Sequence, residues 1–418
     1  MDRVKRNSKL YVGAAFVAIL LALGAGQALL DNVSAQANQA PRFEVDPYWP
    51  KPMPNNWVLG QTIGLTVDDR DHVWLIHRGN DPGTAGLDRT ELAIVTPGGP
   101  RVGECCVAAP PVLEFDAAGN LVGSWGGPNK AGGYEWPESN HGVVIDHKGF
   151  VWIGGNGPGD SHILKFTRDG KFVAQYGKAN ARRTASTDPT AKPGFAANSM
   201  DMDNFGRVAK MFIDPKANEA YVSDGYLNHR VAVMDLDTGK IKRMWGAYGE
   251  PPTDLALGPY DPAAPVARQF RNPLHCAEMS VDGLVYACDR PNDRVQIFTR
   301  EGKFVKEVFV EKNTRADGSV WDIAFSKDPK QQFLYMADGV NEHVRVFDRA
   351  SMTELYNFGY GGRQPGMFLG VHSIATDSKG NIYTTETYTG KRLQKFAFKG
   401  LGAVPKSGTP PWPTTAAK

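Results

Sequence analysis

Six segments of this 418-residue chain repeat one short pattern, and the repetition strongly limits the folds it can adopt. Each has an apolar strand, a turn rich in Asp, Gly, Lys or Pro, and a second strand with aromatic and β-branched residues. The segments are IGLTVDDRDHVWLIHR, HGVVIDHKGFVWIGGN, AKMFIDPKANEAYVSDG, HCAEMSVDGLVYACDR, WDIAFSKDPKQQFLYMADG and HSIATDSKGNIYTTET. Short strands recurring with a period above about 40 residues predict an all-β fold, a six-bladed β-propeller.

The last unit ends after its third strand, so one strand is missing from the ring. The segment RFEVD, Arg42–Asp46, is a strand-like stretch near the N-terminus that can supply it. Closure in this way leaves no exposed sheet edge. The first unit is interrupted by a long insertion, from about Gly79 to Pro111.

The N-terminus has the three parts of an export signal. A basic segment precedes the apolar run VGAAFVAILLALGAG, and Ala35-Gln36-Ala37 forms a cleavage site. An uncleaved membrane anchor is the alternative, since the apolar run approaches the length of a bilayer span. We expect a signal peptide over 1–37, the propeller over 38–400 and a Pro-rich flexible tail over 401–418. The protein is predicted to be periplasmic or extracellular.

The charge balance argues against a nucleic-acid partner. The formal net charge is +2, and residues 1–37 contribute four basic and two acidic residues, which leaves zero for the rest. A neutral chain with interspersed charges gives no reason to propose nucleic-acid binding. We expect a monomer that acts on a small-molecule or peptide substrate and touches a membrane only through an uncleaved N-terminal segment.

The four cysteines fit an oxidising compartment. Cys276 and Cys288 lie on the two arms of one predicted hairpin, nearly opposite each other, which predicts a cross-strand disulfide. Cys105 and Cys106 are adjacent in the first insertion. They could form a vicinal disulfide, a soft-metal site or two free thiols, and we favour the disulfide.

Three histidines occupy the same place in alternate units. His141, His275 and His372 each lie eight residues before a turn glycine. If each begins the innermost strand of a blade, the three imidazoles point toward the central axis at one height. Three neutral imidazoles with an open fourth position are the ligand set of a catalytic zinc site. The sequence therefore predicts zinc held by these histidines.

Two further residues lie where loops at one end of the blades face the axis. Arg78 in VWLIHRGND comes just past a strand end, and Tyr226 in YVSDGYLNHR occupies the matching point of the third unit. Beside a metal, a tyrosine can act as a base and an arginine can bind an oxyanion. The structural alternative is that Tyr226 covers the blade and Arg78 forms a salt bridge.

The motifs that carry a family resemblance are HVWLIHRGND, YVSDGYLNHRVAVMD, NPLHCAEM, CDRPNDRVQIF and GVHSIATD. In them the chain resembles the peptidyl-α-hydroxyglycine α-amidating lyase family of NHL-repeat propellers, from about Trp57 to Lys399. The resemblance implies zinc on the three histidines, Tyr226 and Arg78 as active-site residues, and Arg290 near the substrate. Lyases of this family cleave a peptidyl-α-hydroxyglycine into a peptide amide and glyoxylate.

The chain departs from the family pattern at three places. The resemblance implies a structural calcium completed by the carbonyls of Leu65 and Val143, but Ser373 replaces its carboxylate ligand. Lys210 stands at an inward position where the family has an acid, which makes it a candidate substrate-binding residue. Gly370-Val371 replaces Met-Pro before the last histidine. These departures argue against calcium and leave the natural substrate open.

Three hypotheses follow for the function. The first is a zinc-dependent carbon–nitrogen lyase acting on an α-hydroxyglycine-type substrate. The second is a non-catalytic NHL-type propeller that binds proteins or glycans, and it should tolerate loss of metal and of Tyr226. The third is a lactonase-like hydrolase, which we rank last because such enzymes hold their metal with carboxylate and amide groups.

Overall fold

The computed structural model describes residues 39–79, 87, 91–92, 100, 102–129, 131–185 and 192–413. They form two compact units, one of residues 39–42 and 399–405 and one of residues 43–398 and 406–413. In the first, Arg42 Nη1 donates a hydrogen bond of 3.3 Å to the Ala403 carbonyl. The export signal predicted over 1–37 lies outside the described residues. Among those described, no helix has the length and apolar character to cross a membrane.

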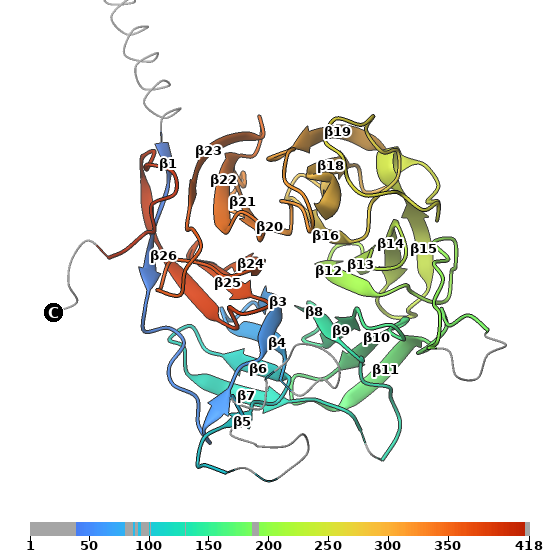
Figure 1. Ribbon diagram of the computed structural model, residues 1–418, viewed down its shortest axis with the longest axis horizontal. Helices are drawn as coiled ribbons and strands as arrows, with labels where there is room; N and C mark the ends of the chain where they lie inside the picture. Colours follow the sequence, from blue (N-terminus) through green and yellow to red (C-terminus); the bar gives the residue numbers. More distant parts are fainter. Residues whose placement is uncertain are drawn as a thin grey trace, which may run out of the picture. The chain divides into compact units, whose positions relative to one another are not determined.

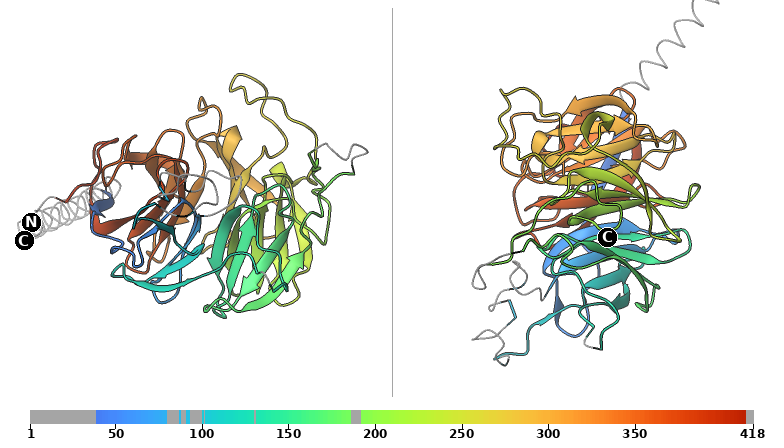
Figure 2. Two further views of the ribbon diagram at one scale, coloured as in Figure 1. Left: turned by 60° about the horizontal axis from the view of Figure 1, so that its bottom comes forward. Right: turned by 90° about the vertical axis from the view of Figure 1, so that its right-hand side faces the viewer.

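The second unit contains the predicted six-bladed β-propeller, seen along its axis in Figure 1 and from two other directions in Figure 2. Blade 1 consists of β3 (Gln61–Val67), β4 (Val73–Arg78), β6 (Val112–Phe115) and β7 (Leu121–Trp125). Blade 2 consists of β8 (Asn140–Ile145), β9 (Val151–Gly155), β10 (His162–Phe166) and β11 (Phe172–Gly177). Blade 3 consists of β12 (Val208–Asp214), β13 (Glu219–Asp224), β14 (Arg230–Asp235) and β15 (Ile241–Trp245).

Blade 4 consists of β16 (Leu274–Met279), β17 (Val285–Asp289), β18 (Arg294–Phe298) and β19 (Phe304–Phe309). Blade 5 consists of β20 (Asp322–Phe325), β21 (Phe333–Asp338), β22 (His343–Asp348) and β23 (Thr353–Phe358). Blade 6 consists of β24 (Val371–Thr376), β25 (Ile382–Glu386), β26 (Leu393–Ala403) and β1 (Gln39–Asp46). The innermost strands β3, β8, β12, β16, β20 and β24 contact one another in a ring around the axis. The described residues also include two short 3-10 helices, η1 (Ala247–Gly249) and η2 (Arg290–Asn292).

The closing strand is confirmed. β1 is the outer strand of the sixth sheet, next to β26, as expected for RFEVD. The predicted loose tail from residue 401 is structured in part, since β26 runs to Ala403. Farther on, the Pro411 carbonyl accepts a hydrogen bond from Val45 N and the Asn357 carbonyl accepts one from Gly408 N. A proline-rich segment lacks N–H donors, but its carbonyls can still pair.

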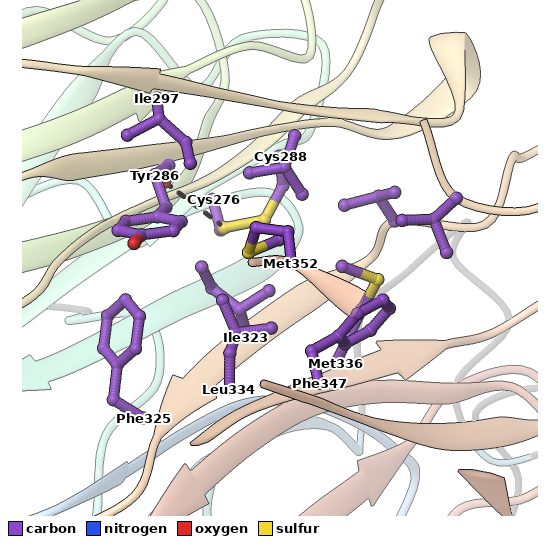
Figure 3. Packing of buried hydrophobic residues seen from close by; sticks show 13 residues of the cluster. Cys276, Tyr286, Cys288, Ile297, Ile323, Phe325, Leu334, Met336, Phe347 and Met352 are labelled. Atoms are coloured by element: carbon purple, nitrogen blue, oxygen red, sulfur yellow. Dashed lines mark hydrogen bonds between the residues drawn. A yellow bond between two sulfur atoms is a disulfide. The ribbon is translucent and has the colours of Figure 1, made fainter. Parts of the chain in front are cut away.

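Apolar side chains from neighbouring blades pack face to face, so each pair of blades shares a core. Figure 3 shows the cluster between blades 4 and 5, where Tyr286 packs against Phe325 with ring centroids 5.1 Å apart. The predicted disulfide between Cys276 and Cys288 lies in this core, and the two residues are directly opposite in the β16–β17 pairing. The bridge therefore joins two strands within one blade.

The insertion in the first blade is described only in part. Its β5 (Val107–Ala108) pairs in parallel with β2 (Trp57–Val58). Cys105 and Cys106, which precede β5, form a disulfide in the structure. Of the three states considered for this pair, the structure has the bridged one.

Buried ion pairs fix the loops between the second and third strands of four consecutive blades. The pairs are Asp224–Arg230, Asp289–Arg294, Asp338–Arg345 and Glu386–Arg392, with N–O distances of 2.9, 2.7, 2.8 and 2.8 Å. In blades 3 and 4 both partners are fully buried, and each carboxylate also accepts a hydrogen bond from an asparagine in the loop. These pairs anchor the loops that carry Tyr226 and Arg290.

Candidate active site

The three predicted histidines meet at the axis of the propeller. His141, His275 and His372 lie on β8, β16 and β24, the innermost strands of alternate blades. Their ring centroids are 4.7, 5.0 and 5.1 Å apart. The strand pairing of all three is irregular beside the histidine. Such bulges re-aim side chains, which explains how three strands turn an imidazole toward one point.

Each imidazole is oriented by a backbone carbonyl of the following blade. The Nδ1–carbonyl pairs are His141 with Ala209 (2.6 Å), His372 with Ile63 (2.8 Å) and His275 with Trp321. A carbonyl oxygen only accepts hydrogen bonds, so each Nδ1 carries a proton and each Nε2 presents a lone pair. A backbone carbonyl on the second ring nitrogen is a common support for a metal-binding histidine.

The three imidazoles are neutral. Burial lowers the pKa of each well below its ordinary value, and the positive charge of Arg290 lowers each pKa further. Their ligand nitrogens all lie within 4.8 Å of one another. We call these three residues the histidine cluster. Its neutral, converging nitrogens fit a divalent metal ion such as zinc.

His77 shows how a structural histidine differs. Its Nδ1 accepts a hydrogen bond of 3.2 Å from Gly60 N, and its Nε2 donates one of 3.0 Å to the Pro110 carbonyl. Because both ring nitrogens of this buried residue are paired with backbone, none remains for a metal. The histidine cluster keeps one nitrogen of each ring directed at the others instead.

The hydroxyl of Tyr226 covers the histidine cluster. Its Oη lies 2.9 Å from His141 Nε2 and 3.0 Å from His275 Nε2. A phenol has one proton and can donate to only one of these nitrogens. His372 makes its hydrogen-bond contacts through Nδ1, with the Ile63 carbonyl and the Ser373 hydroxyl. The cluster therefore holds more lone pairs than donors, which favours a cation.

Arg290 lies beside Tyr226. Its Nη1 donates to Tyr226 Oη at 3.4 Å and its Nη2 to Asp317 at 3.3 Å, while its guanidinium stacks over the Trp321 ring at 4.4 Å. The buried Nε has no acceptor among the described residues. Burial raises the pKa of Tyr226, and the charges of Arg290 and Arg78 oppose that rise. Arg290 is thus placed to stabilise a phenolate and to bind another anion.

Arg78 lies at the end of β4, against the strand that holds the first histidine. Its Nε donates to the Asn140 carbonyl at 3.0 Å and its Nη2 to Asn156 Oδ1 at 2.7 Å. Asn140 directly precedes His141 in the chain. The positive charge of Arg78 also contributes to the lowered pKa of His141. The structure thus brings the predicted arginine, tyrosine and histidines into one site.

Lys210 belongs to a second buried group, which we call the lysine cluster. Its Nζ lies 2.7 Å from Asp322 and 2.8 Å from Glu278. Burial alone would lower the pKa of Lys210, but the two carboxylates raise it above its ordinary value. The charge of this ammonium is thus balanced within the protein. These contacts do not favour the substrate-binding role predicted for Lys210.

Calcium does not fit the place that the resemblance suggested. Leu65, Val143, Lys210 and Ser373 border a cavity of about 10 Å³ beneath the histidines. That volume is close to the minimum for a single water molecule. The Ser373 hydroxyl already donates to the Ile63 carbonyl at 2.7 Å, and no carboxylate borders the cavity among the described residues. Calcium prefers about six to eight oxygen ligands, so the residues present argue against it.

A further acidic group, Asp68 with His72 and Glu114, has ligand-type atoms close together. Arg70 lies 3.1 Å from Asp68 and 2.6 Å from Glu114, and Arg168 also pairs with Asp68. The two guanidinium groups already neutralise these carboxylates. This group is an ion-pair network that joins the first and second blades.

Three residues of the site were missed by sequence reasoning. Trp321 stacks on Arg290, Asp317 pairs with Arg290, and Tyr388 donates a hydrogen bond of 2.7 Å to Asp317. Trp321 begins the fifth repeat at the position that histidine holds in alternate units, so the repeat alignment could have found it. Asp317 and Tyr388 lie in loops outside the repeated pattern, where the sequence offers no comparable signal.

The fold and the site define a six-bladed β-propeller with a buried three-histidine group that could hold a metal. The chain is 25% identical over 273 residues to peptidyl-glycine alpha-amidating monooxygenase B of Xenopus laevis. This alignment covers 65% of the chain and 26% of that protein. The chain spans about a quarter of the length of the curated relatives it matches. No model of a known protein family matches the sequence.

Solved structures resemble the fold at low sequence identity. A protein of unknown function from Bacteroides thetaiotaomicron aligns with a TM-score of 0.50 and 10% identity over 86% of this chain and 76% of that one. A streptogramin B lyase aligns with a TM-score of 0.49 and 11% identity over 87% and 99%. These similarities bear on the fold alone.

Proposed function

We propose that this protein is a zinc-dependent carbon–nitrogen lyase that cleaves an N-acyl-α-hydroxyglycine into an amide and glyoxylate. The observation that carries the proposal is the convergence of three neutral Nε2 atoms beneath the Tyr226 hydroxyl, with Arg290 at its side. Distant similarity to a peptidyl-glycine alpha-amidating monooxygenase and the family motifs around these residues support the substrate class.

The histidine cluster would hold the zinc through its three Nε2 atoms. A zinc ion there supplies a Lewis acid that lowers the pKa of a bound hydroxyl group. The neutral state of the imidazoles favours this role, because a protonated histidine cannot bind a metal. The carbonyls of the neighbouring blade keep the rings oriented without using the ligand nitrogens.

Tyr226 would move the proton of the reaction. The tyrosine would act as the phenolate, after its own proton has passed to solvent. Its Oη would then accept the proton of the α-hydroxyl group, the electrons of that O–H bond would form the carbonyl of glyoxylate, and the C–N bond would break with its electrons going to the amide nitrogen. The proton then passes from Tyr226 to the leaving amide nitrogen, so the enzyme returns to its starting state. Arg290 stabilises the phenolate, and Arg290 with Arg78 binds the substrate carboxylate.

Glyoxylate release from α-hydroxyhippurate tests the proposal directly. Zinc-loaded protein should release glyoxylate above the rate in buffer, and the His275→Ala variant should not. Activity on this substrate is expected to be weak, because Ser373 and Lys210 depart from the family pattern. If zinc-loaded protein releases no glyoxylate, the lyase proposal is wrong. Retention of protein or glycan binding after loss of metal and of Tyr226 would support the binding-module hypothesis instead.

We also propose that the protein is an exported monomer. Two disulfides support an oxidising compartment, where such bonds persist. Fractionation of the producing cells should find the protein outside the cytoplasm with both bridges formed. Free thiols at Cys276 and Cys288 in native material would contradict the proposal.

A further inference from the structure

A cavity of about 780 Å³ adjoins the candidate active site on the side of blades 3 and 4. Part of its wall is the segment 254–260, which follows the last strand of blade 3. This cavity is larger than the two cavities that Lys210 borders, of about 240 and 10 Å³. Ligand pockets of proteins commonly have volumes of about 300–1,000 Å³, so it is large enough for a drug-sized group.

Asp317 links the wall of the cavity to the candidate active site by hydrogen bonds. This residue lines the cavity and accepts hydrogen bonds from Arg290 Nη2 and, at 2.7 Å, from Tyr388 Oη. Arg290 in turn reaches the hydroxyl of Tyr226. Two other wall residues, Leu227 and Pro291, directly follow Tyr226 and Arg290 in the chain. A substrate bound at Tyr226 and Arg290 would therefore extend toward this cavity.

The free surface of the cavity is mainly apolar. Its apolar wall residues include Leu227, Leu255, Leu257, Pro259, Tyr260 and Pro291. Leu255 is 71% exposed, although leucine gains from burial. Leu255, Leu257 and Pro259 line one wall of the cavity with apolar surface that is not fully buried, and a contiguous apolar patch of this kind is typical of ligand-binding grooves.

Several polar groups of the wall already have partners within the protein. Asp254 accepts hydrogen bonds from Ser199 N, at 3.0 Å, and from Ser199 Oγ. Arg271 donates to Asn292 at 3.0 Å and to the Gly258 carbonyl. Because these groups are engaged, an apolar ligand would not strip them of hydrogen bonds.

We propose that this cavity is the subsite for the acyl part of the substrate, and that it selects N-acyl-α-hydroxyglycines with a large apolar acyl group. The inference rests on the proposed function and gives it a substrate class. The glycine carboxylate lies at Arg290, and the acyl chain extends past Asp317 along Leu255 and Leu257. A short acyl group leaves this apolar wall exposed, so it binds weakly.

Equilibrium binding of unreactive N-acylglycines, measured by calorimetry, tests the subsite without requiring turnover. N-decanoylglycine has eight more methylene groups than N-acetylglycine and should bind at least about 30-fold more tightly, since each buried methylene favours binding. Decanamide, which lacks the carboxylate, should bind at least about 10-fold more weakly than N-decanoylglycine, because a charged hydrogen bond to arginine is lost. Equal affinities for N-acetylglycine and N-decanoylglycine would overturn the proposal.

The variant Leu255→Ser locates the subsite. It should weaken binding of N-decanoylglycine about 5- to 10-fold and leave N-acetylglycine unchanged, since it removes apolar contact only beyond the carboxylate. Val122→Ser, at a 51% exposed position on β7, is the matched control and should change neither affinity. Both side chains are exposed, so both variants should keep the melting temperature of the parent protein. Unchanged binding of N-decanoylglycine by Leu255→Ser would reject this location.

The outcomes separate the subsite from the lyase proposal. Binding that depends on acyl length, without glyoxylate release from any α-hydroxy substrate, would keep the subsite and reject the lyase. Glyoxylate release with affinities that do not depend on acyl length would keep the lyase and reject the subsite.

Discussion

The histidine cluster and the lysine cluster are both buried at the innermost strands of the propeller, but they differ in how their charges are balanced. In the lysine cluster the ammonium of Lys210 lies between Glu278 and Asp322, so the protein supplies its own cation. In the histidine cluster two of the three Nε2 lone pairs face one phenolic hydroxyl, that of Tyr226. The first group is complete without a ligand, and the second favours an added cation.

The two clusters are built by neighbouring residues of the same strands. The Ala209 carbonyl orients His141, and the next residue is Lys210. The Trp321 carbonyl orients His275, and the next residue is Asp322. Backbone and side chain of one strand segment thus serve two different groups. The comparison predicts that changes in the lysine cluster mainly affect stability, whereas changes in the histidine cluster mainly affect metal binding and activity.

The largest stability effect is expected from Lys210→Met. The variant removes the cation and leaves two carboxylates buried together, so the free energy of unfolding should fall by about 3–5 kcal/mol. Urea denaturation measures the change. Lys303→Met, at an exposed turn, is the control and should cost less than about 0.5 kcal/mol. Equal stabilities of the two variants would show that the lysine cluster is not a structural pair.

Tyr226→Phe tests the opposite side of the comparison. The variant removes only the phenolic oxygen, so folding and metal content should be unchanged. The rate of glyoxylate release should fall about 10²-fold or more, as expected for loss of a general base. Tyr360→Phe, at a 43% exposed position, should keep the parent rate. An unchanged rate in Tyr226→Phe would remove Tyr226 from the mechanism.

Removing the disulfide beside His275 tests whether the position of this histidine depends on a covalent bond within its blade. The double variant Cys276→Ala/Cys288→Ala lacks this bridge. Its free energy of unfolding should fall by at most about 2–3 kcal/mol, because the bridge spans only a short segment of the chain. Metal content should be unchanged, since the Trp321 carbonyl orients His275. Loss of metal in this variant would mean that the bridge, not the neighbouring blade, holds the histidine in place.

The smallest effect, taken per pH unit, is a pH dependence of the lysine cluster. Burial raises the pKa of Glu278 to about 7, despite the opposing charge of Lys210. The folded state then binds a proton more tightly than the unfolded state, so this carboxyl group stabilises the protein at low pH. That contribution should decline by up to about 1.4 kcal/mol per pH unit between about pH 4.5 and pH 7. Glu278→Gln should remove this part of the slope, and an unchanged profile would contradict the assignment.

The repeat made the fold predictable from the sequence. Alternating apolar residues and turn signals recur six times, and the closing strand followed from the count of strands in the last unit. The convergence of His141, His275 and His372 was also predictable, because equal positions in alternate repeats meet at the axis. The disulfide between Cys276 and Cys288 followed from their opposite positions in one hairpin.

What the sequence did not reveal depends on contacts between blades and loops. Lys210 was predicted as a substrate contact, and the sequence did not reveal its ion pairs with residues of two other innermost strands, β16 and β20. Asp317 and the segment 254–260 belong to irregular loops, whose positions no periodic pattern determines. The cavity they border became visible only in the folded chain.

Metal analysis tests the central claim most directly. The purified protein, exposed to zinc and then dialysed, should contain about one zinc per chain, as expected for a three-histidine site. The exposed-site control His147→Ala should match it, and His275→Ala should lose most of the metal while remaining folded. Equal zinc content in His275→Ala and the parent protein, or no zinc in the parent protein, would contradict the account.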